Sequence, residues 1–225
     1  MKLRSMYVAT VAALALCAGA AQASGFANGG FENTTPISPL PPGGATSFAA
    51  NWLSAPTGNP VTLSNDAHSG LHSALVSVPS GFGGSTLFQN SIDHGGLPDL
   101  VPGLSPILTF WAKGDASTTG NALFALRYLD GIVNIRYNSG NQFFHTSINP
   151  NTWTKITFAG GVIPVGAKAA FLEINTAVGP LLDGRPNAIK IDDINLSPVP
   201  EPESYALMLA GLGLVSMVVR RRRSV

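Results

Sequence analysis

The sequence of 225 residues is almost free of cysteine, because its only one, Cys17, lies in an apolar stretch near the start. The remainder of the chain therefore has no thiol for a disulfide or a thiolate metal site. Charged residues make up only 11% of the sequence, and acidic side chains outnumber basic ones between Ser24 and Pro198. That part of the chain lacks the basic patch that binding to nucleic acid requires.

Common catalytic motifs are absent as well. The chain contains no Gly-x-Ser-x-Gly, no His-Glu-x-x-His and no glycine loop of the kind that binds phosphate. We therefore predict that the protein is not an enzyme. Glycoside hydrolysis by two carboxylates is the less favoured alternative, because an acid and a base can come from distant strands.

The first 23 residues have the pattern of a secretory signal peptide. Lys2 and Arg4 precede an apolar stretch that ends in the small-residue triplet Ala21-Gln22-Ala23. We predict cleavage before Ser24, so that residues 1–23 are removed during export. A retained membrane anchor is the alternative, but the stretch is short for one.

The last 27 residues form a second targeting segment. Val199 is followed by Pro200, Glu201 and Pro202, then by the apolar run 205–219, and finally by Arg220, Arg221, Arg222 and Arg223. The run predicts a short transmembrane helix, and the arginines place its tail in the cytoplasm. A buried C-terminal helix of the domain is the alternative, but it leaves the arginines unexplained.

These three parts, in this order, resemble the PEP-CTERM sorting signal of Gram-negative bacteria that make exopolysaccharide. The resemblance implies recognition by a membrane-embedded exosortase and cleavage near Pro-Glu-Pro. It also implies that the protein is transiently anchored in the inner membrane with its domain in the periplasm. The destination that it implies is the cell surface or the extracellular matrix.

Residues 24–198 predict a single all-β domain, a two-sheet antiparallel β-sandwich. Glycine and proline recur throughout, and the segments between them are short and rich in Val, Ile, Thr, Phe and Leu. Gly81, Gly83 and Gly84 are expected in a loop. Besides the hairpin described next, the strands expected are Val61–Ser64, His72–Val78, Ile107–Lys113, Thr152–Phe158, Ala169–Asn175 and Ala188–Leu196.

The clearest local signal is Asp130-Gly131 between two alternating apolar runs, which predicts a two-residue hairpin. Leu129 should then pair with Ile132. This register places two sets of side chains on opposite faces. The core face receives Phe124, Leu126, Tyr128, Val133, Ile135 and Tyr137, and the other face receives Arg127, Asn134 and Arg136.

Six short motifs occur in the order seen in carbohydrate-binding modules with a galactose-binding-like jelly roll, and this second resemblance covers most of the mature domain. In those modules the first and last strands lie side by side. The motifs are Asn28-Gly-Gly-Phe-Glu32, Trp52, His68-Ser-Gly-Leu-His-Ser-Ala-Leu75, Leu108-Thr-Phe-Trp111, Trp153-Thr-Lys-Ile-Thr-Phe158 and Ile191-Asp-Asp-Ile-Asn-Leu196.

One structural calcium ion is the metal site that we predict. Calcium prefers oxygen ligands, and Glu32 and Asp192 would meet if the first and last strands pair. A strand bulge would bring in Asp193 instead, and ordinary hydrogen-bonded carboxylates are the alternative. Asp66, His68 and His72 could suggest a transition metal, but surface histidines are the favoured interpretation.

Binding of a carbohydrate such as exopolysaccharide, without catalysis, is the function that we expect. Aromatic rings contact sugar faces, and amides or arginines bind hydroxyl groups. A purely structural matrix protein without a defined ligand is the main alternative. Trp52, Trp111 and Trp153 are expected in the core. The candidate binding residues are Arg127, Asn134, Arg136, Phe143 and Phe144.

Overall fold

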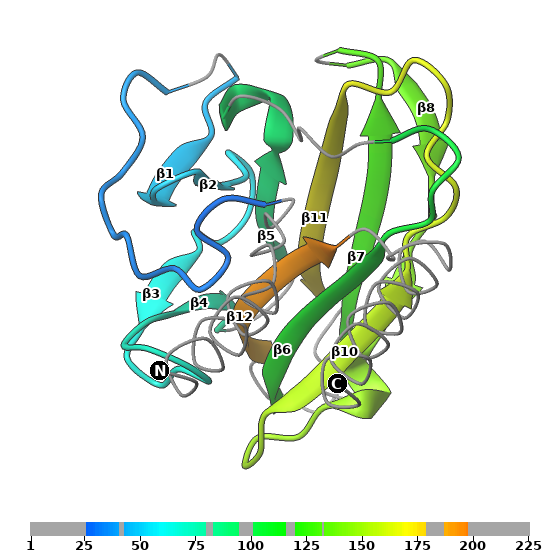
Figure 1. The fold of residues 1–225 in the computed structure, drawn as a ribbon. Coiled ribbons are helices and arrows are strands. Elements are labelled where there is room, and N and C mark those ends of the chain that lie inside the picture. Colours follow the sequence, from blue (N-terminus) through cyan, green and yellow to red (C-terminus); the bar gives the residue numbers. More distant parts are fainter. Residues whose placement is uncertain are drawn as a thin grey trace, which may run out of the picture.

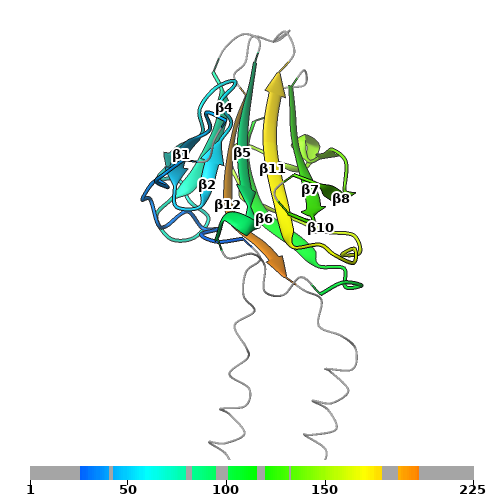
Figure 2. The same ribbon diagram turned by 90° about the horizontal axis from the view of Figure 1, so that it is seen from above.

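The protein folds into two antiparallel β-sheets packed face to face (Figure 1, Figure 2). The computed structural model describes residues 26–40, 43–79, 83–94, 101–115, 120–131, 133–178 and 187–197. The predicted signal peptide and the predicted sorting segment, with its motif, apolar run and arginine cluster, lie outside these residues. Within the described ranges no helix is long and apolar enough to cross a membrane.

The larger sheet has seven strands in the order β1-β2-β5-β11-β7-β8, and β9 also pairs with β7. Its central strands, β5, β11 and β7, pair along most of their length and carry the candidate site described below. The bounds are β1 Thr46–Ala49, β2 Trp52–Ser54, β5 Gly83–Asn90, β7 Gly120–Leu129, β8 Ile135–Asn138, β9 Gln142–Phe143 and β11 Ala169–Val178.

The smaller sheet has five strands in the order β10-β6-β12-β4-β3. Two short 3-10 helices, η1 at Ser91–His94 and η2 at His145–Ser147, follow β5 and β9 in the chain. The bounds are β3 Thr62–Ser64, β4 Ser73–Val78, β6 Ile107–Asp115, β10 Thr154–Ala159 and β12 Asn187–Ser197.

The core lies between the two sheets because alternate residues of each strand turn inward. On β7 the inward residues are Phe124, Leu126 and Tyr128, all buried, while Arg127 between them faces outward. The Tyr128 hydroxyl donates to the Gly160 carbonyl at 2.9 Å, and burial raises its pKa. The predicted two-sheet sandwich is therefore confirmed.

The strands predicted from the sequence correspond to β3, β4, β6, β10, β11 and β12, with ends that differ by a few residues. Four strands of the larger sheet were missed, namely β1, β2, β5 and β9, and β5 is the most important of them. It begins at Gly83, inside the segment expected to be a loop, and its inward side includes the polar residues Ser85 and Gln89. These buried polar groups hide the apolar alternation that identifies a strand.

The predicted register of the hairpin is wrong. Leu129 pairs with Ile135, and the Asp130 N–H donates to the Asn134 carbonyl at 3.0 Å. Arg136 closes this wider loop through an ion pair of 2.7 Å with Asp130. The predicted partner, Ile132, lies outside the described residues.

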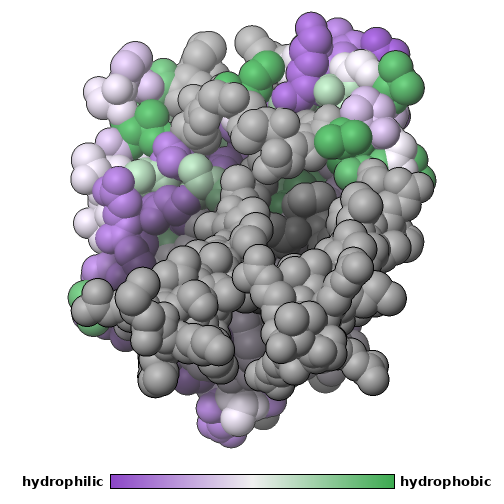
Figure 3. All heavy atoms as spheres, in the orientation of Figure 1, coloured by the Kyte–Doolittle hydropathy of each residue, from purple (hydrophilic) through white to green (hydrophobic). Residues whose placement is uncertain are grey.

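The wider loop changes which side chains reach the core. Tyr137 packs on Tyr128 as predicted, with 5.2 Å between ring centroids. Val133 and Ile135 were also expected inside, yet they are 74% and 55% exposed. Hydrophobic and hydrophilic residues accordingly lie together on the surface near β8 (Figure 3).

The N-terminal segment meets β12, but not as a strand. Residues 26–30 form turns, with Asn28 and Phe31 at positive φ. The Ile194 N–H donates to the Gly29 carbonyl at 3.0 Å, while the strand partners of β12 are β4 and β6. The expectation of paired first and last strands is therefore wrong, although the two segments do touch. A bulge interrupts β12 between Asp192 and Asn195.

Candidate functional site

The outer face of the larger sheet carries a strip of aromatic and polar side chains. The register places Phe88 of β5 opposite Glu173 of β11, and Arg127 of β7 opposite Phe171 of β11. All four alternate with buried residues, so they point away from the core. We call the residues Thr86, Phe88, Arg127, Phe171, Glu173 and Asn175 the outer strip.

Contacts within the outer strip hold its members in place. The rings of Phe88 and Phe171 stack with centroids 5.7 Å apart, and the Arg127 guanidinium lies 5.5 Å from the Phe171 ring. The same guanidinium donates to Glu173 Oε2 at 2.7 Å. Asn175 Nδ2 donates to Glu173 Oε1 at 2.7 Å, which fixes the carboxylate from its other side.

A further hydrogen bond extends the strip to β5, because the Thr86 hydroxyl donates to Asn175 Oδ1. The Arg127 and Glu173 side chains keep 22% and 27% of their surface exposed. The strip therefore offers apolar ring surface beside fixed donors and acceptors, an arrangement suited to a ligand rich in hydroxyl groups.

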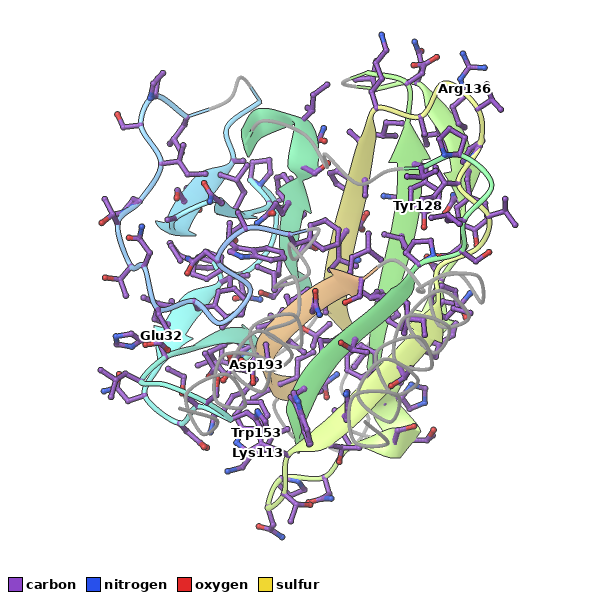
Figure 4. The ribbon with its side chains drawn as sticks, in the orientation of Figure 1. Glu32, Lys113, Tyr128, Arg136, Trp153 and Asp193 are labelled. Atoms are coloured by element: carbon purple, nitrogen blue, oxygen red, sulfur yellow. The ribbon has the colours of Figure 1, made fainter. Side chains whose placement is uncertain are left out.

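Of the predicted binding residues, Arg127 lies in the outer strip. Asn134 is exposed in the loop before β8, and Arg136 is exposed and paired with Asp130 at the end of β7 (Figure 4). Phe143 is 57% exposed on β9. Phe144 is buried, with its ring 5.3 Å from that of Phe110, so it contributes mainly to the core.

Sequence reasoning missed the other members of the outer strip. Phe171, Glu173 and Asn175 alternate along a strand that was predicted, so their common face could have been read from the sequence. Phe88 and Thr86 lie on β5, which was not predicted.

The two carboxylates predicted to bind calcium contact the same loop, residues 68–72. Asp192 Oδ2 accepts from the His68 N–H at 2.7 Å, and Glu32 Oε1 accepts from the Leu71 and His72 N–H groups at 2.9 Å. Figure 4 shows Glu32 and Asp193 on the same side of the molecule. This donor set has the oxygen chemistry that calcium prefers.

Burial and hydrogen bonding shift the pKa values of these carboxyl groups in opposite directions. Burial raises the pKa of Asp192 to about 6, against the lowering effect of three backbone N–H groups. The N–H groups of His72 and Leu71 hold the pKa of Glu32 below its usual value. Within the described ranges no three His, Cys, Asp or Glu side chains gather as a metal site, so backbone carbonyls would have to complete a calcium shell.

Trp111 and Trp153 are only partly buried, on the outside of the smaller sheet, so the expectation that they belong to the core is wrong. The His68 ring stacks on Trp111 with 3.8 Å between centroids, and His68 Nδ1 lies 2.6 Å from Asp193 Oδ2. The expectation for Trp52 is confirmed, because it is fully buried.

Asp66 binds two lysines. Lys113 Nζ lies 3.0 Å from its carboxylate, and Lys190 Nζ binds the same group. Figure 4 shows Lys113 beside Trp153. Asp66 and His68 thus contact different groups, the two lysines and the Asp193 carboxylate.

Comparisons with known proteins identify the C-terminal segment and the fold. Residues 198–223 match the PEP-CTERM protein-sorting motif, as the sequence predicted. The motif indicates an exported protein that is processed at the membrane. A search of curated protein sequences finds no match to the chain.

Several solved structures share the sandwich. The enzymatically active domain of tailspike protein 4 from bacteriophage CBA120 aligns with a TM-score of 0.55 and 21% identity, over 78% of this chain and 21% of the tailspike chain. That likeness supports the fold assignment. This chain thus spans about a fifth of the length of that protein.

Two carbohydrate-binding modules are also similar. One is TmCBM61 in complex with β-1,4-galactotriose, with a TM-score of 0.47 and 18% identity, over 78% of this chain and 99% of the module. The other is the C-terminal family 22 module of Clostridium thermocellum Xyn10B, with a TM-score of 0.42 and 20% identity, over 76% of this chain and 96% of the module. The fold and the sorting motif together define the class: an exported β-sandwich protein with a PEP-CTERM motif.

Proposed function

We propose that the protein is a carbohydrate-binding protein of the cell surface or extracellular matrix, sorted by an exosortase, and that it acts without catalysis. The observation that carries this proposal is the outer strip. Its aromatic rings, guanidinium, carboxylate and amide lie on three adjacent strands and are fixed by one another.

Sugar recognition suits this arrangement for two reasons. The C–H faces of a pyranose pack against aromatic rings, and the stacked rings of Phe88 and Phe171 remain partly exposed. Hydroxyl groups need donors and acceptors in fixed positions, which Arg127, Glu173 and Asn175 supply. Because these side chains are already ordered, binding costs little conformational entropy.

Affinity electrophoresis in gels that contain neutral polysaccharides, such as β-1,4-galactan and xylan, tests the proposal. The wild-type protein should be retarded by at least one polysaccharide. Arg127→Ala and Asn175→Ala should weaken that retardation about tenfold, because each removes hydrogen bonds to the ligand. Arg136→Ala should have a smaller effect, because Arg136 forms an ion pair with Asp130 and lies outside the outer strip.

The rival functions predict other results. A purely structural matrix protein predicts no retardation in any gel, which would contradict carbohydrate binding. A glycoside hydrolase predicts new reducing ends from the same polysaccharides, which would contradict a role without catalysis.

We also propose a structural calcium ion at the loop 68–72, held by Glu32 and Asp192 together with backbone carbonyls. Both carboxylates already lie against this loop, and the buried Asp192 carboxylate has no cationic side chain as its partner in the described ranges. The ion would join the N-terminal segment to β12 in a domain without disulfides.

A further inference from the structure

A groove separate from the outer strip opens between the edges of the two sheets. It lies between β9, which pairs only with β7, and β10, the end strand of the smaller sheet. Its volume of about 480 Å³ falls within the roughly 300–1,000 Å³ of small-molecule sites. Phe143 and Phe144, two of the predicted carbohydrate-binding residues, are among those that line it.

Aromatic rings form the base of the groove and keep it rigid. Phe124 and Phe158 pack edge to face with centroids 5.2 Å apart, and Phe144 lies 6.2 Å from Phe124. All three line the groove, and Phe124 and Phe144 also belong to the buried core. The groove is therefore shaped by core packing and does not depend on mobile side chains.

Phe143 gives the groove an exposed aromatic wall. It is the only aromatic residue among the large hydrophobic side chains that are exposed in the described part of the chain, at 57%. The His145 ring contacts it nearly perpendicularly at 6.0 Å. The neighbouring Gln142 is held by donation from Nε2 to the Ser139 carbonyl at 2.7 Å.

Lys155 is the one charged residue that lines the groove, and it is exposed. Lys113, Arg127, Arg136 and Lys190 all form ion pairs with carboxylates. Among the lysines and arginines that the structure describes, only Lys155 and Lys168 form none. Lys155, which lines the groove, therefore has no carboxylate partner among the described residues.

We propose that this groove is a second binding site, and that it accepts an acidic sugar such as a hexuronate residue of a polysaccharide. The carboxylate binds Lys155, and the C–H face of the ring packs on Phe143. The ring hydroxyls bind Gln142, Ser147 and Thr157. A neutral sugar would leave the lysine unpaired, and a purely apolar ligand would leave the amide and hydroxyl groups without partners.

Affinity electrophoresis of the purified protein in polygalacturonate tests this site. A gel with the methyl-esterified polymer is the comparison, because it keeps the sugar rings and removes their charge. Wild type should be retarded strongly by polygalacturonate and weakly by the ester. Lys155→Gln should bind polygalacturonate about tenfold more weakly, the effect of losing one charge-assisted hydrogen bond.

Two further variants separate the groove from general charge attraction. Phe143→Ala should weaken retardation although it leaves the net charge unchanged. Lys168→Gln is the matched control, because Lys168 is exposed and unpaired but lies outside the groove, and it should behave as wild type. Circular dichroism confirms that each variant is folded.

Three results would overturn the proposal. They are no retardation of wild type by polygalacturonate, equal retardation of wild type by polygalacturonate and by its methyl ester, or an equal loss of retardation in Lys155→Gln and Lys168→Gln. The neutral polysaccharides test the outer strip with other variants. Failure at the groove is therefore distinguishable from failure at the outer strip.

Discussion

Asp66 illustrates how the charged residues of this domain are used, because it accepts hydrogen bonds from two lysines of neighbouring strands. The hydrogen bond from Lys190, and then that from Lys113, holds the pKa of Asp66 below its usual value. A carboxyl group with a lowered pKa stabilises the folded protein above its unfolded pKa, and this contribution disappears as the pH falls through the folded pKa.

We therefore expect Asp66→Asn to lower the free energy of unfolding at neutral pH by about 1 kcal/mol or less, because the side chain is 38% exposed and solvent screens the pair. Urea denaturation over a pH series measures the effect. The difference from wild type should shrink as the pH falls below 3.8, the usual pKa of an aspartate side chain. A difference that stays constant with pH would contradict the electrostatic explanation.

The calcium proposal makes a second prediction for single residues. Saturating calcium should raise the melting temperature relative to EDTA, by about 2–4 °C for each kcal/mol of binding free energy. Glu32→Gln should remove most of this response because it removes a charged ligand. Asp66→Asn is the control and should keep the response, since Asp66 binds lysines. Equal melting temperatures of wild type in calcium and in EDTA would show that no ion is bound.

Among the elements, the strands with alternating apolar residues were predictable and the others were not. The residues of β11 and β12 alternate clearly between buried and outward positions, so both strands could be predicted from the sequence. The buried polar side chains of β5 conceal the same alternation. The two-residue hairpin predicted from Asp130-Gly131 was wrong for a different reason. The Asp130–Arg136 ion pair stabilises a loop wider than Asp-Gly usually forms.

The junction between the N-terminal segment and β12 can be tested with two adjacent glycines. A Cβ at Gly29 would lie 2.0 Å from the Ile194 carbonyl oxygen, whereas one at Gly30 would meet nothing closer than 3.5 Å. Gly29→Ala should therefore destabilise the protein by about 1–3 kcal/mol, and Gly30→Ala by much less. Urea denaturation measures both. Equal stabilities would show that the two segments do not make this contact.

For the whole molecule, the sorting motif could be predicted because such signals are contiguous in sequence. The outer strip could not, because it combines side chains of β5, β11 and β7 that only the sheet topology brings together. The position of Arg127 on an outward face was predictable from alternation. Its partners Glu173 and Phe171 depend on the pairing of β7 with β11, which the sequence does not reveal.

The central claim is that an exported domain holds carbohydrate through its outer strip. Quantifying the protein in the washed extracellular matrix and in the culture fluid tests this claim most directly, for wild type and for Arg127→Ala. We predict that wild type is recovered mainly in the matrix and that Arg127→Ala is released into the fluid. Retention of both inside the cells, or equal distributions of the two proteins outside them, would contradict it.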